Sequence, residues 1–229
     1  MAIIFPPLNS ASEEGLLAIG GNLDSETLLS AYKKGIFPWP ISKESPLTWF
    51  SPDPRGIIKI DELHISKSFE KFLKKTQYTI KFNTNPMQVI HNCAKMKRKH
   101  EEGTWITHNI INAYVNFFKL GHVYTVEVYE NEILIGGLYG VTINNYLSGE
   151  SMFHSKPNAS KLALYYLLQT AKKNSIPWID IQMVTPVLES FGGMYIQRDD
   201  FVKMLNRQIA GPKKRSEVFI HSQTQLDQP

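Results

Sequence analysis

Apolar side chains recur at helical spacing along much of the first half of the chain. In residues 66–75, Phe69, Phe72 and Leu73 fall on one face of a helix and lysines recur on the other. Ser66 precedes this run as a capping residue, and Gly121 follows a later run as a terminator. The pattern predicts helices over residues 25–34, 66–75, 86–100 and 107–120.

The second half of the chain begins with strands. Apolar and polar residues alternate over residues 122–129, and two further strands follow short polar turns, at 133–142 and about 146–151. These three strands predict an antiparallel meander. The remaining predicted elements are a helix at 158–173 capped by Asn158, a strand at 178–184, a short helix at 186–191, and a last strand and helix. We therefore expect an α+β fold with a mainly antiparallel sheet.

Proline is concentrated near the N-terminus. Residues 1–60 carry seven of the thirteen prolines around one short helix, which Asp24 or Ser25 can cap and Gly35 can close. This composition predicts a small irregular N-terminal domain at residues 1–60, followed by a larger domain at 61–229.

The composition narrows the class of protein. A chain of 229 residues with 42% hydrophobic residues is typical of a soluble protein, and no apolar run approaches the roughly twenty residues that span a bilayer. The first residues lack a charged leader, which favours a cytoplasmic location. With Cys93 as the sole cysteine, no intramolecular disulfide can form. The seven histidines show no HExxH pattern and no Walker loop occurs, so neither a metal nor ATP is indicated.

Two carboxylates stand among apolar or small residues in segments that are patterned as core strands. Ionised groups are costly there unless they have a partner or a task, so Glu150 and Asp180 are the leading candidates for chemistry. Asp180 and Gln182 lie two residues apart, which places both on the same face of a strand. The structural alternatives are that Asp180 caps or pairs inside the fold and that Glu150 forms a salt bridge with Arg198 or Lys161.

Seven motifs, in order along the chain, resemble one family. They are GLLAIGGNL at 15–23, AYKKGIFPW at 31–39, WFSPDPR at 49–55, GTWIT at 103–107, GGLYGV at 136–141, GESMF at 149–153 and DIQ at 180–182. Together they resemble the leucyl/phenylalanyl-tRNA–protein transferases, over about residues 5–205. Seven motifs in one order are hard to obtain by chance.

The resemblance implies a bacterial aminoacyltransferase. Such an enzyme moves leucine or phenylalanine, with methionine a further candidate, from Leu-tRNA or Phe-tRNA to the N-terminal Arg or Lys of an acceptor protein and marks that protein for degradation. It implies a C-terminal domain of the GCN5-related acyltransferase type, a monomer and no cofactor. The order of elements alone also fits an acetyl-CoA-dependent enzyme, but residues 154–161 lack the glycine-rich phosphate turn. A second alternative is a non-catalytic module that binds tRNA or peptide.

The resemblance also suggests roles for individual residues. Asp180 is expected to fix the Gln182 amide, whose carbonyl accepts from the attacking amine, while Glu150 serves the positive charge or the amine of the acceptor. The residues expected to bind substrate are Leu138, Met152 and Phe153 in an amino-acid pocket, with Trp49 and Trp105 stacking near the tRNA adenosine. Two positions depart from the family: Leu138 replaces a common methionine, and Val187 replaces a common histidine.

Basic residues gather in two places. Net charge is only +4, but Lys67, Lys71, Lys74 and Lys75 form a helical stripe and Lys97 and Arg98 belong to a second cluster. A solvated helix face would explain either cluster alone. With two clusters and the family resemblance, we expect contact with the tRNA backbone, which would be salt-sensitive and poorly sequence-specific.

Overall fold

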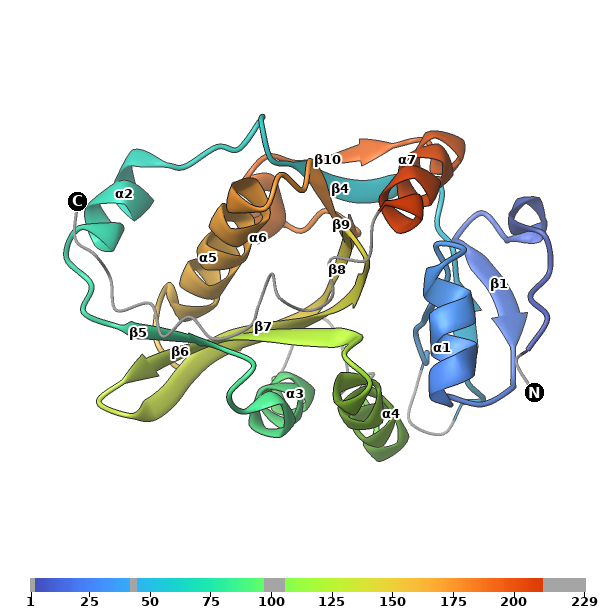
Figure 1. The fold of residues 1–229 in the computed structure, drawn as a ribbon, viewed down its shortest axis with the longest axis horizontal. Helices are drawn as coiled ribbons and strands as arrows, with labels where there is room; N and C mark the ends of the chain where they lie inside the picture. The colour runs from blue at the N-terminus through green and yellow to red at the C-terminus, as the bar shows by residue number, and fades with distance from the viewer. Residues whose placement is uncertain (1–2, 42–44, 97–105, 212–229) are drawn as a thin grey trace.

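The computed structural model describes residues 3–41, 45–96 and 106–211, and its strands form two sheets (Figure 1). A three-stranded sheet near the N-terminus has the order β1-β3-β2, and a seven-stranded sheet has the order β10-β4-β9-β8-β7-β6-β5. The strands are β1 (Leu16–Ile19), β2 (Phe37–Pro38), β3 (Thr48–Phe50), β4 (Arg55–Lys59), β5 (Thr79–Phe82), β6 (Val123–Glu130), β7 (Ile133–Ile143), β8 (Tyr146–His154), β9 (Trp178–Gln182) and β10 (Gly193–Ile196). The expected α+β class is confirmed.

Helices cover both faces of the large sheet. They are α1 (Ser25–Tyr32), α2 (Lys67–Leu73), α3 (Pro86–Lys95), α4 (His108–Lys119), α5 (Ala159–Lys173), α6 (Pro186–Glu189) and α7 (Arg198–Ala210), with a 3-10 turn at Leu8–Ser10. Helix α5 packs on one face of β6, β7 and β8, while α3 and α4 pack on the other (Figure 1). Each face has its own apolar core, and the core beneath α3 and α4 continues into the small N-terminal sheet. Among the helices in the described ranges, none has the length and apolar character that a membrane crossing requires.

The relative direction of neighbouring strands changes in the middle of the large sheet. Neighbouring strands are antiparallel except β8 and β9, which run parallel and pair at a single position, Ser148 with Asp180. A parallel neighbour needs a crossover connection, and α5 supplies it. Beyond their one pairing, β8 and β9 leave room between them.

Most predicted helix boundaries are confirmed. The side chains of Asp24, Ser66 and Thr107 cap α1, α2 and α4 by accepting from a backbone N–H two or three positions into the helix. Asn158 is the N-cap residue of α5, as predicted, but it has φ +64° and its side chain makes no capping hydrogen bond. The small domain is also more regular than expected, since it contains the sheet β1-β3-β2. Strand β4 joins the large sheet although it precedes residue 60.

A buried carboxylate on β6 fixes the start of α3. Glu127 has no exposed surface and accepts from the backbone N–H groups of Thr84 and Asn85 and from the hydroxyls of Thr84 and Thr125. The Thr84 and Asn85 donors precede the first turn of α3, where negative charge is favourable.

We expect Glu127→Gln to lower the free energy of unfolding by about 2–3 kcal/mol, because one oxygen acceptor becomes a donor that faces other donors. Urea denaturation measures this change. On the same strand, Glu130→Gln is the control, since Glu130 is partly exposed and forms an ion pair with the half-exposed Lys156. Equal losses in the two variants would contradict the assignment.

Candidate active site

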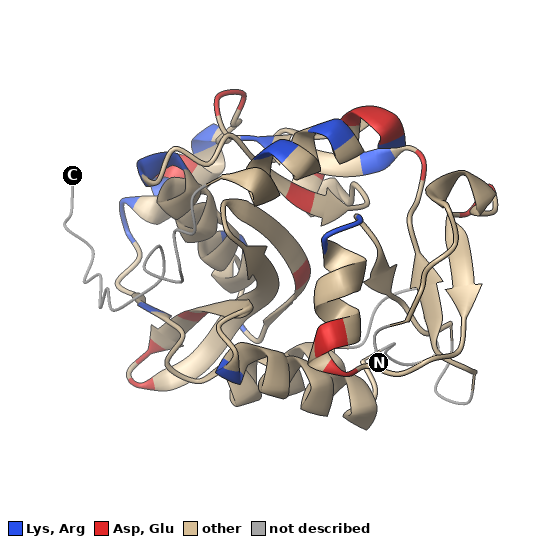
Figure 2. Ribbon diagram, turned by 45° about the vertical axis from the view of Figure 1, so that its right-hand side comes forward, with Lys and Arg blue, Asp and Glu red and all other residues tan. Residues whose placement is uncertain are grey.

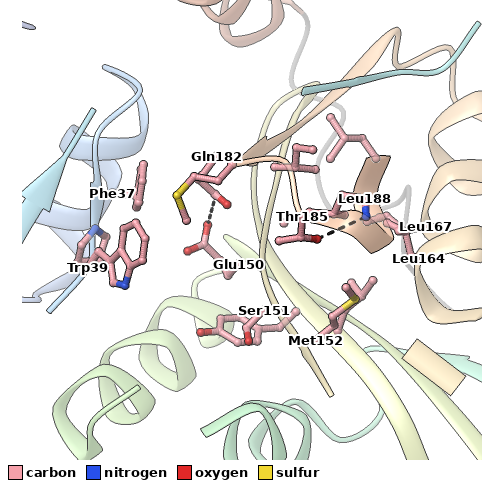
Figure 3. A pocket seen from close by; sticks show the side chains of 17 residues that line it. Phe37, Trp39, Glu150, Ser151, Met152, Leu164, Leu167, Gln182, Thr185 and Leu188 are labelled. Carbon is pink, nitrogen blue, oxygen red and sulfur yellow. Dashed lines mark hydrogen bonds between the residues drawn. The ribbon is translucent and has the colours of Figure 1, made fainter. Parts of the chain in front are cut away.

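A cavity of about 390 Å³ lies where β8 and β9 separate. Its lining comes from the small N-terminal sheet and its margin (Phe37, Pro38, Trp39), from β7 and β8 (Leu138, Tyr139, Gly149, Glu150, Ser151, Met152), from α5 (Leu164, Leu167) and from β9, α6 and their link (Ile179, Ile181, Gln182, Met183, Thr185, Leu188). Figure 3 shows Phe37 and Trp39 on one side of Glu150 and Gln182, and Leu164, Leu167 and Leu188 on the other. The cavity is therefore mostly apolar, with a carboxylate and an amide between its ends.

Glu150 enters this cavity because β8 carries an extra residue. Across from β7, Gly149 pairs with Gly140 and Ser151 pairs with Tyr139, so Glu150 has no partner of its own. A bulge of this kind re-aims a side chain. Three side chains donate hydrogen bonds to the carboxylate of Glu150: Ser148 Oγ to Oε1 (2.9 Å), Gln182 Nε2 to Oε1 (3.3 Å) and Tyr114 Oη to Oε2 (3.2 Å).

Burial raises the pKa of Glu150 from 4.5 to about 7. The hydroxyls of Tyr32, Ser148 and Tyr114 oppose this rise by stabilising the charged form, while the nearby Asp180 adds to it. The salt bridge considered for Glu150 is absent, since no Lys or Arg of the described ranges pairs with it, and Arg198 binds the Ser51 carbonyl and Asp53 instead. Glu150 is therefore a carboxyl group that changes charge near neutral pH.

Gln182 sits at the end of β9 in an unusual backbone conformation. Its φ is +55°, in the left-handed region that side-chain-bearing residues rarely adopt. The side-chain Nε2 donates to Ser148 Oγ (2.7 Å) and to Glu150 Oε1 (3.3 Å). Such backbone conformations persist only where the surroundings enforce them, and they concentrate at functional sites.

Asp180 does not line the cavity and has no exposed surface. Its carboxylate accepts from Arg55 Nε (2.8 Å) and Nη2 (2.7 Å), from Tyr146 Oη (2.5 Å) and from the backbone N–H of Gln182 (3.0 Å). The expectation that Asp180 fixes the Gln182 amide is wrong in this detail: Asp180 holds the main chain, and Ser148 and Glu150 hold the amide. Burial opposes the charge of Arg55, but Asp180 outweighs that effect and raises the pKa of the guanidinium.

Two of the three residues expected to form an amino-acid pocket line the cavity. Leu138 and Met152 face each other across β7 and β8. Phe153 does not: it is 4% exposed in the opposite core, and a Cβ added to Gly137 would meet both Phe153 and Val89 of α3. Because side chains alternate along a strand, Met152 and Phe153 point to opposite faces.

The expectation for Trp49 is wrong as well. Trp49 is 1% exposed in the small domain, where its indole donates to the Gly20 carbonyl (3.0 Å) and its ring meets Phe5. Trp39 lines the cavity instead, packed against Phe50. The signal for Trp39 was present in the sequence, in the motif at residues 31–39. Trp105 lies outside the described residues.

The remaining sequence candidates either do not line the cavity or lie outside the described residues. Lys67, Lys71, Lys74 and Lys75 are exposed on and just after α2. Figure 2 marks the positions of lysine and arginine along the ribbon in blue. Helix α2 packs through Phe69 against Tyr165 and Phe191. Lys97 and Arg98 lie outside the described residues. Val187, at the position of the common histidine, is not part of the cavity lining, whereas Leu188 is.

This arrangement suits a reaction between a charged or amine-bearing group and an apolar one. The long apolar part of the cavity fits a branched or aromatic side chain, and its polar centre offers a carboxylate and an amide oxygen to a donor. Sequence analysis did not predict the residues that bind Glu150 and Asp180 without lining the cavity, among them Arg55, Tyr32, Tyr114 and Ser148. Tyr32 and Arg55 stand within the motifs at residues 31–39 and 49–55, but nothing in the local sequence of any of the four indicates a contact with Glu150 or Asp180.

Comparison with known proteins gives consistent matches. The family model described as leucyl/phenylalanyl-tRNA protein transferase matches residues 57–206, and the model of its N-terminal domain matches residues 21–53. Proteins named leucyl/phenylalanyl-tRNA–protein transferase are 43% identical over 212 residues in Pseudoalteromonas atlantica (92% of this chain, 90% of the relative) and 44% identical over 203 residues in Flavobacterium johnsoniae (89% and 95%). Among solved structures, L-PGS from Bacillus licheniformis aligns at a TM-score of 0.39 and 14% identity, covering 68% of this chain and 49% of that one.

Proposed function

The chain belongs to the leucyl/phenylalanyl-tRNA–protein transferase family, and we propose that its cavity joins leucine or phenylalanine from aminoacyl-tRNA to the N-terminal arginine or lysine of acceptor proteins. The observation that carries this proposal is the pairing of an apolar cavity with the Glu150–Gln182 centre. The product would carry a new N-terminal residue that marks the protein for degradation.

The apolar end of the cavity is proposed to hold the aminoacyl side chain. Leu138 and Met152 form one wall, and Leu164, Leu167 and Leu188 lie beyond them. Binding of this kind discriminates weakly between side chains that differ by a methylene group, which fits an enzyme that accepts leucine, phenylalanine and methionine. Trp39, at the other end, is the ring available to stack on the terminal adenosine of the tRNA.

The chemistry requires little from the protein beyond placement and management of one proton. The α-amine nitrogen of the acceptor attacks the ester carbonyl carbon, a peptide bond forms, the ester C–O bond to the ribose breaks, and the amine proton ends on the released ribose hydroxyl. Because Gln182 Nε2 is bound to Ser148 and Glu150, its carbonyl oxygen is the atom left to accept from the amine. Glu150 receives the positively charged end of the acceptor, and holding both reactants together supplies much of the rate.

The large domain is proposed to have a GCN5-related acyltransferase architecture behind the small N-terminal domain. An antiparallel β6-β7-β8 meander, a crossover through α5 and a parallel β9 that separates from β8 at the cavity support this proposal. All the groups of the site come from one chain, so a monomer is sufficient. We place the enzyme in the cytoplasm, where aminoacyl-tRNA is available.

Helix α2 is proposed to contact the tRNA backbone. We expect the double variant Lys71→Glu, Lys74→Glu to raise KM for Leu-tRNA about tenfold at low salt, with little change in kcat, because two phosphate contacts become repulsive. The measurement is initial rates against tRNA concentration at several salt concentrations, and the difference should shrink as salt rises.

Lys203→Glu is the control for this helix, because Lys203 is also exposed, on α7, and its ion-pair partner among the described residues is Asp200. An equal rise in KM for the control would show a general charge effect and remove the specific role of α2.

The test of the function itself uses two acceptors that differ at one residue. Radiolabelled leucine on Leu-tRNA is offered to a protein with N-terminal arginine and to the same protein with N-terminal alanine. Label on the arginine protein alone is the expected result. Binding of tRNA without label on either protein would favour the non-catalytic module.

A further inference from the structure

Arg55 occupies the junction between the two walls of the cavity. Its side chain is 1% exposed, Nη1 donates to the Gly35 carbonyl (3.0 Å), and Nε and Nη2 bind Asp180. The central carbon of the guanidinium lies over two aromatic rings, 4.8 Å from the Phe37 centroid and 4.5 Å from the Phe201 centroid. One buried cation therefore contacts the small domain, β9 and α7 at once.

On one side, Arg55 controls the turn that presents Gln182. The same Asp180 oxygen that accepts from Arg55 Nε also accepts from the Gln182 backbone N–H at 3.0 Å. The pairing of β4 with β9 shifts at this point, since Gly56 faces Gln182 and Ile57 faces Asp180, leaving Ile181 without a partner. The left-handed conformation of Gln182 is thus held by a carboxylate that is itself held by Arg55.

On the other side, Arg55 contacts the wall that the small domain contributes. Phe37 lines the cavity and packs on the guanidinium, and Phe37 and Trp39 are ring neighbours at 6.4 Å. A lysine could keep the charge at this position, but it lacks the planar fork that binds both oxygens of Asp180 while stacking on two rings.

We infer that Arg55 is a positioning residue for the transfer reaction, which sets the placement of the Gln182 amide relative to the Phe37–Trp39 wall of the cavity. The inference rests on the proposed function for its kinetic consequence. Its structural consequence, an ordered Gln182 turn, is independent of any substrate.

The kinetic test compares Arg55→Lys with Arg198→Lys. Arg198 is also largely buried and donates to a backbone carbonyl, that of Ser51. Within the described ranges its side chain binds Ser51 and Asp53, and Arg198 is not one of the residues that line the cavity. We expect Arg55→Lys to lower kcat about 100-fold at saturating Leu-tRNA, as a displacement of about 1 Å in a reacting group does, with a much smaller change in KM. Arg198→Lys should stay within threefold of the parent. A kcat within threefold for folded Arg55→Lys would overturn the inference.

The second experiment observes the backbone turn at Gln182 directly, by hydrogen exchange. In protein labelled with ¹⁵N-glutamine, the backbone N–H of Gln182 should be protected from hydrogen exchange in the parent and in Arg198→Lys. It should lose this protection in Arg55→Lys. Retained protection at Gln182 would overturn the inference even if transfer fell. A parent protein that shows the protected turn but transfers nothing would count against the proposed function alone.

Phe201→Leu keeps the test decisive if Arg55→Lys does not fold. Phe201 packs on the guanidinium from outside the cavity, so its loss loosens Arg55 and leaves the ion pair intact. We expect a smaller fall in kcat and partial loss of Gln182 protection. Unchanged kcat and protection in Phe201→Leu would also overturn the inference.

Discussion

Replacing Asp180 with asparagine is expected to lower the free energy of unfolding by about 3–5 kcal/mol and to slow transfer by about two orders of magnitude. The first effect follows because Arg55 would stay buried without a counter-charge. The second follows because asparagine keeps one acceptor oxygen but replaces the other with an NH2 donor that would face the N–H groups of Arg55, which weakens the contact that holds the Gln182 turn. Both are measured on one sample, by urea denaturation and by initial rates well below the unfolding midpoint.

Asp200→Asn separates this effect from a general loss of negative charge. Asp200 is exposed on α7, where the structure pairs it with Lys203, so its replacement should change stability by less than about 1 kcal/mol. If Asp180→Asn kept the parental stability and rate, the negative charge of the carboxylate would be dispensable. The size and the remaining hydrogen bonds of the side chain would then account for the whole effect of this residue.

The second large effect is expected for Glu150→Gln, in the dependence of transfer on pH. With a pKa of about 7, Glu150 is mostly protonated at pH 6 and mostly ionised at pH 8, so the parent rate should rise across that interval. The variant should lose this rise, and its deficit should reach about 100-fold at pH 8. The preference for arginine over alanine at the acceptor terminus should fall with it. The control is Glu189→Gln, which is exposed on α6.

Stability gives an independent reading of the same carboxyl group. The folded state binds the Glu150 proton more tightly than the unfolded state does. The contribution of Glu150 to the free energy of unfolding therefore falls as pH rises from 4.5 to about 7, and it is constant above that pH. The free energy of unfolding of Glu150→Gln, minus that of the parent, should therefore increase over that interval by up to about 3 kcal/mol. A difference that does not vary with pH would contradict the raised pKa.

The sequence predicted the elements better than it predicted the directions of their side chains. Helical periodicity, the capping residue Ser66 and the terminator Gly121 are local signals, and they located α2 and α4 correctly. The small three-stranded sheet was missed because β2 and β3 are two and three residues long and are stabilised by tertiary packing. Short strands of this kind carry no periodicity that could be read.

The site illustrates the same limit at the level of single residues. Glu150 and Asp180 were identified because a carboxylate in an apolar strand is visible in the sequence. Their partners were not, since Arg55 lies 125 positions from Asp180 along the chain and nothing local indicates the pairing. Trp49 was preferred over Trp39 although both belong to quoted motifs, because burial in the small domain depends on contacts that only the fold reveals.

The extra residue in β8 has a consequence for how this strand can change over evolutionary time. Gly149 and Ser151 already pair with adjacent residues of β7, so loss of the single codon for Glu150 would leave an unbroken ladder with every flanking side chain on its present face. A descendant gene could in this way lose the acidic group in one step and still encode the same sheet. Relatives that retain the fold but have abandoned the chemistry should be sought by a one-residue gap at this position.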